Sequence, residues 1–148
     1  ESRGLGDVYK RQVHVQQDEV FEYFLSILQT AIDLRDEQNT NLSSKTLKKA
    51  LAYIDEHYTS ENLSLGTVAC EVQVGANYLS SVFSQNMQKT FTEYISEKRM
   101  EKAKKLLKST ELPASEIAAQ VGYKDPHYFS FVFKKTQGCS PREYRSGI

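Results

Sequence analysis

Two short predicted helices, at about residues 77–87 and 127–136, carry polar side chains suited to contact DNA bases. In each segment apolar residues recur at the spacing that buries one side of a helix, and polar residues fill the other side. A helix that enters the major groove needs this division, because one face packs on its own domain while the other approaches base edges. Asn and His hydrogen-bond base edges, and short hydroxyl side chains allow a close approach. The outward positions are Asn77, Ser80, Ser81 and Ser84 in the first helix, and His127, Ser130, Phe131 and Lys134 in the second.

Positive charges near these helices are suited to bind phosphate. The formal net charge of the chain is zero, but residues 1–40 hold four Lys or Arg against eight Asp or Glu, whereas residues 41–148 hold fifteen against eleven. The part with the two helices is therefore the basic part, as a phosphate-facing surface requires. No cation lies between Asn77 and Met87, so the second helix is expected to anchor DNA more strongly than the first. The predicted phosphate contacts are Ser84, Lys98, Arg99, Lys124, Lys134 and Lys135.

The two helices belong to a passage that occurs twice in the chain. Residues 63–94 match residues 112–144 at an offset of 49 in the first half of the passage and of 50 in the second half, so the extra residue falls in a turn. Each copy predicts a short helix, a tight turn and a second helix, which is the helix-turn-helix arrangement. Two copies are too few for a solenoid, which needs about three. We therefore expect two helix-turn-helix units, at about residues 63–88 and 113–137.

Helix-end signals indicate how these units are built and joined. Ser64 is a predicted N-cap, and residues 73–76 form the first turn. The residues Thr90 to Glu93 form a capping box that opens a linker helix over about residues 90–109. In the second copy Gly122 makes the turn, Asp125 and Pro126 begin the next helix, and a capping box at Ser140 begins a last short one.

The linker helix has a length that suits DNA. At 1.5 Å per residue it spans about 30 Å, close to the roughly 34 Å of one DNA turn. One chain is then expected to place two helices in successive major grooves.

The segment upstream of the repeat is expected to connect to another domain. Residues 7–12 back-translate to the end of a transposase adapter used for sequencing libraries, so residues 1–12 are predicted to be a disordered artefact, with a genuine disordered terminus as the alternative. Residues 13–40 carry an apolar stripe at helical spacing from Val20 to Leu34 and form a predicted connector helix. A break is predicted at residues 39–41, after which Ser43 or Ser44 caps the next helix and the domain of residues 41–148 begins.

Several classes of function are disfavoured by what the sequence contains. No stretch alternates with period two, so the fold is predicted to be all-α. The three histidines are scattered and no catalytic or phosphate-binding motif is present, so we expect neither an enzyme nor a bound cofactor or metal. No apolar run has the roughly 20 residues of a membrane span, and the two cysteines are expected to be reduced, which is typical of a cytoplasmic protein. A helical protein–protein interaction module remains the alternative from another class.

Two passages resemble a known family. FTEYISEKRMEKAKKLL and SEIAAQVGYKDPHYFSFVFKKTQGCSPREYR are closely similar to the DNA-binding domain of bacterial AraC-type transcription regulators, over about residues 45–145. The phrases ANYLSSVFS and GYKDPHYFS most resemble response regulators of two-component systems, which implies a receiver domain upstream; a cupin-like ligand-sensing domain is the alternative. The resemblance implies promoter DNA as partner and allows RNA polymerase as a further one. The apolar stripe of the upstream segment is expected to pack on a missing domain or on a second subunit, which allows a homodimer. By the same resemblance the base-reading residues are Asn77, Ser80, Ser81, His127, Ser130 and Phe131.

The chain departs from the family pattern at positions that contact DNA. The family commonly has Arg where Ser81 and Phe131 stand, and Lys where Ser84 and Gln85 stand. These helices therefore offer no Arg for direct readout of guanine. The aromatic ring of Phe131 can either contact a thymine methyl group or cover a neighbouring side chain.

Overall fold

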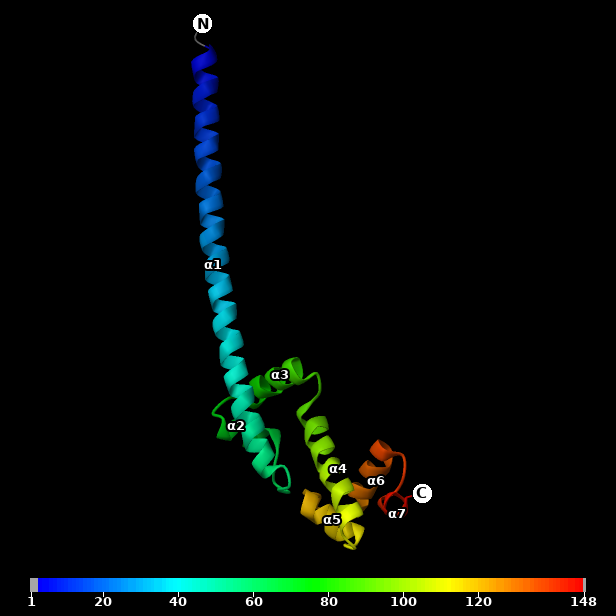
Figure 1. The fold of residues 1–148 in the computed structure, drawn as a ribbon. Coiled ribbons are helices and arrows are strands. Elements are labelled where there is room, and N and C mark those ends of the chain that lie inside the picture. The colour runs from blue at the N-terminus through cyan, green and yellow to red at the C-terminus, as the bar shows by residue number, and fades with distance from the viewer. Residues whose placement is uncertain (1–2, 148) are drawn as a thin grey trace. The chain divides into compact units, whose positions relative to one another are not determined.

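The computed structural model describes residues 3–147, and within them it consists of seven α-helices without a β-strand (Figure 1). The all-α fold predicted from the sequence is confirmed. The chain divides into an N-terminal segment, residues 1–43, and a C-terminal domain, residues 44–148. No helix within the described residues is both long and apolar enough to cross a membrane.

Helix α1 runs from Arg3 to His57 without interruption, which corrects three predictions. No break occurs at residues 39–41, and neither Ser43 nor Ser44 caps a helix, because no Pro or Gly stands there and the hydroxyls of Thr40 and Ser43 bond back to the helix. The Oγ1 of Thr40 donates to the Asp36 carbonyl at 2.8 Å, and the Oγ of Ser43 donates to the Thr40 carbonyl at 3.0 Å. Residues 3–12 are helical where disorder was predicted, since extending an existing helix costs little per residue. The part of that prediction on residues 1 and 2 lies outside the described residues.

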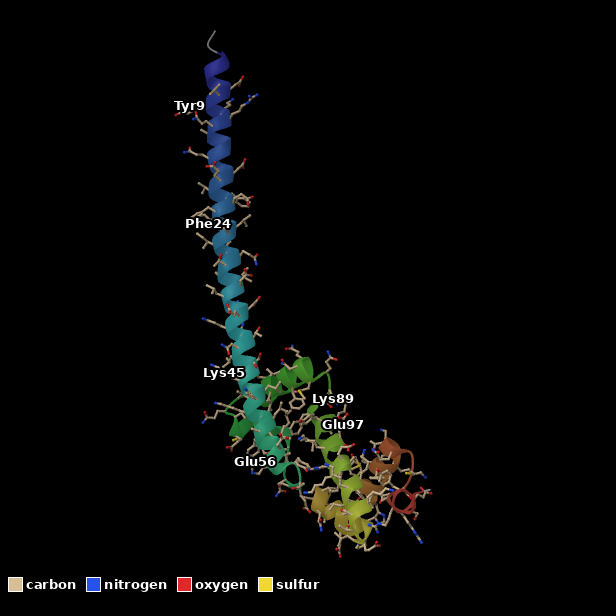
Figure 2. The ribbon with its side chains drawn as sticks, in the orientation of Figure 1. Tyr9, Phe24, Lys45, Glu56, Lys89 and Glu97 are labelled. Atoms are coloured by element: carbon tan, nitrogen blue, oxygen red, sulfur yellow. The ribbon has the colours of Figure 1, made fainter. Side chains whose placement is uncertain are left out.

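The N-terminal segment exposes its apolar side chains. Tyr9 and Phe24 project from α1 (Figure 2), and the Phe24 side chain is 62% exposed. An apolar stripe of this kind normally packs against another element. The exposed members between residues 20 and 34 are Val20, Phe21, Phe24, Leu25, Ile27, Leu28, Ile32 and Leu34.

The first helix-turn-helix unit consists of the end of α1 with α2 (Leu65–Glu71) and α3 (Ala76–Met87). The Ser64 side chain accepts a hydrogen bond from the Thr67 backbone at 3.2 Å and caps α2 as predicted. In the predicted turn, Gln73 has a positive φ of 60°, the left-handed conformation that reverses the chain. The core of this unit contains Ala50, Ile54, Val68, Ala69, Leu79, Phe83 and Ile95.

Helix α4 (Phe91–Ser109) is the predicted linker helix. Thr90 and Glu93 form the capping box, with the Thr90 amide donating to Glu93 Oε2 at 2.8 Å and the Glu93 amide donating to Thr90 Oγ1 at 3.2 Å. The hydrogen bonds from Thr90 lower the pKa of the Glu93 carboxyl, so the cap favours its charged form. Near this end, Lys89 and Glu97 form an exposed ion pair of 2.6 Å (Figure 2).

The second helix-turn-helix unit repeats the design with α5 (Ala114–Val121) and α6 (Pro126–Gln137), followed by α7 (Pro141–Ser146). Gly122 ends α5 at φ 100°, and the Asp125 carboxylate accepts from the His127 amide at 2.8 Å to cap α6. Both features were predicted from the sequence. The core of this unit contains Met100, Ala103, Leu107, Ile117, Ala118, Val121, Tyr123, Phe129 and Phe133.

Candidate nucleic-acid interface

The outer face of α3 is polar and accessible, as its sequence predicts. Leu79, Val82 and Phe83 are buried on the opposite side of the helix. Asn77, Ser81 and Ser84 are exposed, whereas Ser80 is half-buried. The Ser81 hydroxyl donates to the Asn77 carbonyl at 3.1 Å, which leaves its oxygen lone pairs free to accept a bond. This face therefore offers an amide that both donates and accepts, beside small hydroxyls.

The outer face of α6 combines polar, aromatic and cationic side chains. His127, Phe131, Lys134 and Lys135 are exposed, and Ser130 is half-buried with its hydroxyl donating to the Pro126 carbonyl at 3.0 Å. The two lysines stand in the last turns of the helix, where cations also interact favourably with the helix dipole. The two cations expected on the second helix are thus exposed at its surface.

Phe131 contacts a neighbouring side chain and still offers apolar surface. Its ring stacks on that of Tyr128 with centroids 6.4 Å apart and an interplanar angle of 25°. The Phe131 and Tyr128 side chains remain 61% and 57% exposed. Packing on a neighbouring side chain and contact with a thymine methyl group are therefore compatible, because the Phe131 ring packs against Tyr128 and still remains exposed.

Tyr78 and Tyr128 are candidate contact residues that the sequence reasoning did not select. They occupy equivalent positions in the two copies, offset by 50 residues, and both are exposed, Tyr78 by 40%. A phenol ring on the exposed side of a recognition helix can donate a hydrogen bond to phosphate. The signal that pointed to them was the repeat itself, in which this tyrosine recurs on a face that does not form the core.

Two predicted phosphate contacts are occupied within the domain. Lys98 forms an ion pair with Asp55 and lies over the rings of Tyr58 and Tyr94, with Nζ 5.5 Å from each centroid. The hydrogen bond to Asp55 raises the pKa of Lys98. Arg99 donates through Nε to the Tyr58 carbonyl at 2.7 Å and through Nη2 to the Ser60 carbonyl at 2.9 Å. Both side chains therefore already have partners within the domain, and their roles as phosphate contacts stay predictions.

The remaining predicted phosphate contacts are accessible. Ser84, Lys134 and Lys135 lie on the exposed faces of α3 and α6. Lys124 is exposed in the turn before α6, and its Nζ is 3.5 Å from Asn62 Oδ1. Apart from Lys98 and Arg99, the cations proposed to bind DNA all come from the second helix-turn-helix unit.

These features define a class of protein. Two helix-turn-helix units, each with a polar outer face on its second helix and joined by one linker helix, make a tandem helix-turn-helix domain. A family model described as a helix-turn-helix domain matches residues 68–147, more than half of the chain. The chain belongs to the AraC-type helix-turn-helix family.

Similar proteins include regulators of different kinds. The arabinose operon regulatory protein of Escherichia coli K12 is 35% identical over 101 residues, which cover 68% of this chain and 35% of that protein. The C-terminal domain of the two-component response regulator yesN from Fusobacterium nucleatum is 39% identical, with a TM-score of 0.66 over 68% of this chain and 98% of that one. The C-terminal domain of AraT, a response regulator from Geobacillus stearothermophilus, is 43% identical, with a TM-score of 0.68 over 70% of this chain and 85% of that one. The chain spans about a third of the length of the curated relatives it matches.

Proposed function

We propose that this chain is the sequence-specific DNA-binding part of a bacterial transcription regulator. The observation that carries the proposal is the pair of exposed polar faces on α3 and α6, each backed by its own hydrophobic core and joined through α4. Asn77, Ser80 and Ser81 read bases from α3, and His127, Ser130 and Phe131 read them from α6. Ser84, Lys124, Lys134 and Lys135 bind phosphate. Because the units repeat in tandem, one chain reads an asymmetric site in successive major grooves.

The proposed upstream partner of this domain is a phosphorylatable receiver. Support comes from the two similar solved structures, which are C-terminal domains of response regulators at 39% and 43% identity. The regulator then acts at promoters in the cytoplasm, with RNA polymerase as a further proposed partner.

The roles of Lys134 and His127 can be separated by two variants. Lys134→Ala is expected to weaken binding to every duplex by a similar factor and to lower the slope of log affinity against log salt by about 1, since one phosphate contact is lost. His127→Ala is expected to change which sequence is preferred, because base contacts carry the specificity. Selection of duplexes from a randomised pool, followed by gel shifts at two salt concentrations, measures both effects.

The matched control is Lys105→Ala, which removes an exposed cation from α4. Binding without salt dependence, or no binding by the unaltered chain, would contradict the proposed function. Equal changes in sequence preference for Lys134→Ala and His127→Ala would contradict the division of roles.

We further propose that a second copy of the chain covers the exposed apolar stripe of α1. Eight large apolar side chains of this stripe lie exposed within 15 residues, and an exposed apolar surface of this kind marks an interaction site. Phe24→Glu places a charge in the middle of this stripe and is expected to convert a dimer into a monomer, measured by light scattering after gel filtration. The control Glu22→Gln alters the polar side of the same helix and should leave the mass unchanged. A monomeric unaltered chain would contradict the proposal.

A further inference from the structure

The two helix-turn-helix units have separate hydrophobic cores. The buried cluster of the first unit ends on α4 at Ile95, and that of the second unit begins on α4 at Met100. Among the residues that the structure describes, no buried residue belongs to both clusters. The placement of α3 relative to α6 therefore depends on α4 and on the contacts made between its two ends, near residues 96–99.

Arg99 contacts both units at this point. Its guanidinium donates to the carbonyls of Tyr58 and Ser60, at 2.7 and 2.9 Å, in the segment that follows α1 in the first unit. The same group lies over the ring of Tyr123 in the second unit, with Cζ 5.2 Å from the centroid. One side chain thus connects the end of α1 to the turn between α5 and α6.

The backbone of the two units is tightly packed around Arg99. A Cβ atom added to Gly122 would lie 2.9 Å from the Thr59 carbonyl oxygen and 3.0 Å from the Arg99 guanidinium. The Tyr123 hydroxyl lies 3.4 Å from Ser96 Oγ on α4. The turn of the second unit therefore rests directly on the segment after α1, with Arg99 at the edge of the contact.

Arg is suited to this place by its chemistry. The Tyr58 carbonyl directly follows α1, where carbonyls have no partner within the helix, and the Ser60 carbonyl also accepts from the Leu63 amide at 3.3 Å. Bonds from a charged donor are stronger than neutral ones. The planar guanidinium donates through two nitrogens while its face stacks on an aromatic ring, which the single ammonium of Lys cannot do. Burial lowers the pKa of Arg99, and the proximity of Tyr123 opposes that shift.

We propose that Arg99 is a positioning residue that fixes the relative placement of α3 and α6, and thereby the base-pair spacing that the chain accepts between its two DNA contact regions. This inference rests on the proposed function. Arg99 acts through Tyr58, Ser60 and Tyr123 rather than on DNA itself. Without it, α4, the packing of Gly122 against Thr59 and the contact of Lys124 with Asn62 still join the units, but they hold them less firmly, so the two recognition helices sample a wider range of distances and rotations.

The spacing of the two contact regions provides the DNA test. A duplex selected from a randomised pool by the unaltered chain is compared with derivatives that have one base pair inserted or deleted between the two protected regions. Each step shifts one region by about 3.4 Å and about 35° relative to the other. The unaltered chain should lose about tenfold in affinity per step, whereas Arg99→Gln should lose less than about threefold because its units adjust. Lys105→Gln, an exposed cation on the same helix, should behave as the unaltered chain does.

A second readout requires no DNA. Spin labels at Gln85→Cys on α3 and Lys135→Cys on α6, with Cys70 and Cys139 changed to Ser, report the distribution of distances between the recognition helices. Arg99→Gln should broaden this distribution, and Lys105→Gln should not. If Arg99→Gln loses its helical circular dichroism, Arg99→Lys replaces it in both measurements with the same expected outcome.

The two readouts separate the inference from the proposed function. If the unaltered chain binds no duplex, the proposed function fails while the distance distribution still tests the role of Arg99. An unchanged distribution in both Arg99 variants would overturn the inference. So would binding by Arg99→Gln with the same loss per base-pair step as the unaltered chain.

Discussion

Replacing Phe133 with Ala is expected to lower the free energy of unfolding of the C-terminal domain by about 3–5 kcal/mol, the usual cost of truncating a buried Phe. The Phe133 ring is fully buried on α6 and packs edge-on against Tyr144, with centroids 5.5 Å apart, and against Phe129 at 5.8 Å. Since a domain of this size has a total stability of about 5–15 kcal/mol, most of its margin would be lost. Urea denaturation followed by far-ultraviolet circular dichroism measures the change.

The control is Phe131→Ala, two residues earlier in the same helix. This ring is 61% exposed and contacts Tyr128 only at the surface, so its removal should cost about 1 kcal/mol or less. A similar loss for both variants would show that α6 does not bury the face described above.

The separate cores also predict where Phe133→Ala acts. Amide hydrogen exchange should accelerate in α5, α6 and α7 before it does in α2 and α3, because Phe133 contributes only to the core of the second unit. The equivalent change in the first unit, Phe83→Ala, should show the opposite order. Uniform acceleration in either variant would mean that the two cores unfold as one.

Gly122→Ala is expected to destabilise the domain by about 2–5 kcal/mol, from two causes that add. The residue has a φ of 100°, which costs an L-amino acid about 1–2 kcal/mol. The new methyl group would also lie 2.9 Å from the Thr59 carbonyl oxygen, and such overpacking adds about 1–3 kcal/mol. Thermal and urea denaturation measure the total, and the change should also loosen the contact between the two units.

Two other glycines serve as controls that separate the cost of the positive φ from the cost of the close packing at Thr59. Gly138 has a φ of 80° with nothing within 4 Å of an added Cβ, so Gly138→Ala should show the conformational cost alone, about 1–2 kcal/mol. Gly75 has an ordinary φ of −69° and equally open space, so Gly75→Ala should change stability by no more than about 0.5 kcal/mol. Equal losses for Gly122→Ala and Gly138→Ala would contradict the close packing at Thr59.

Local signals predicted most of the fold. Ser64, Thr90, Asp125 and Ser140 were each expected to begin a helix, and each accepts the expected hydrogen bond from a backbone amide within three residues. Such bonds form within a single turn, so the nearby sequence specifies them. The helix break predicted at residues 39–41 was wrong. Polar residues only weaken a helix, and the neighbouring turns can keep it helical across them.

Part of the candidate site could also be predicted from local spacing, and part could not. Outward faces on α3 and α6 follow from the helical spacing of Leu79, Phe83, Phe129 and Phe133, which are all fully buried. Exposure of the residues opposite them was therefore predictable. Tyr78 and Tyr128 were not selected, because the sequence marks an aromatic residue as apolar whether its face is buried or exposed.

The sequence by itself determined the duplicated helix-turn-helix units, their caps and turns, and the residues presented outward on each second helix, because all of these depend on spacings within a few residues. Only the tertiary structure decided what the cations of α4 do. Lys98 and Arg99 find their partners 43 and 41 residues earlier in the chain, at Asp55 and Tyr58. No local pattern encodes which carbonyls and rings a folded chain brings to a guanidinium, so the contacts of Arg99 with Tyr58, Ser60 and Tyr123 could not be predicted from the sequence.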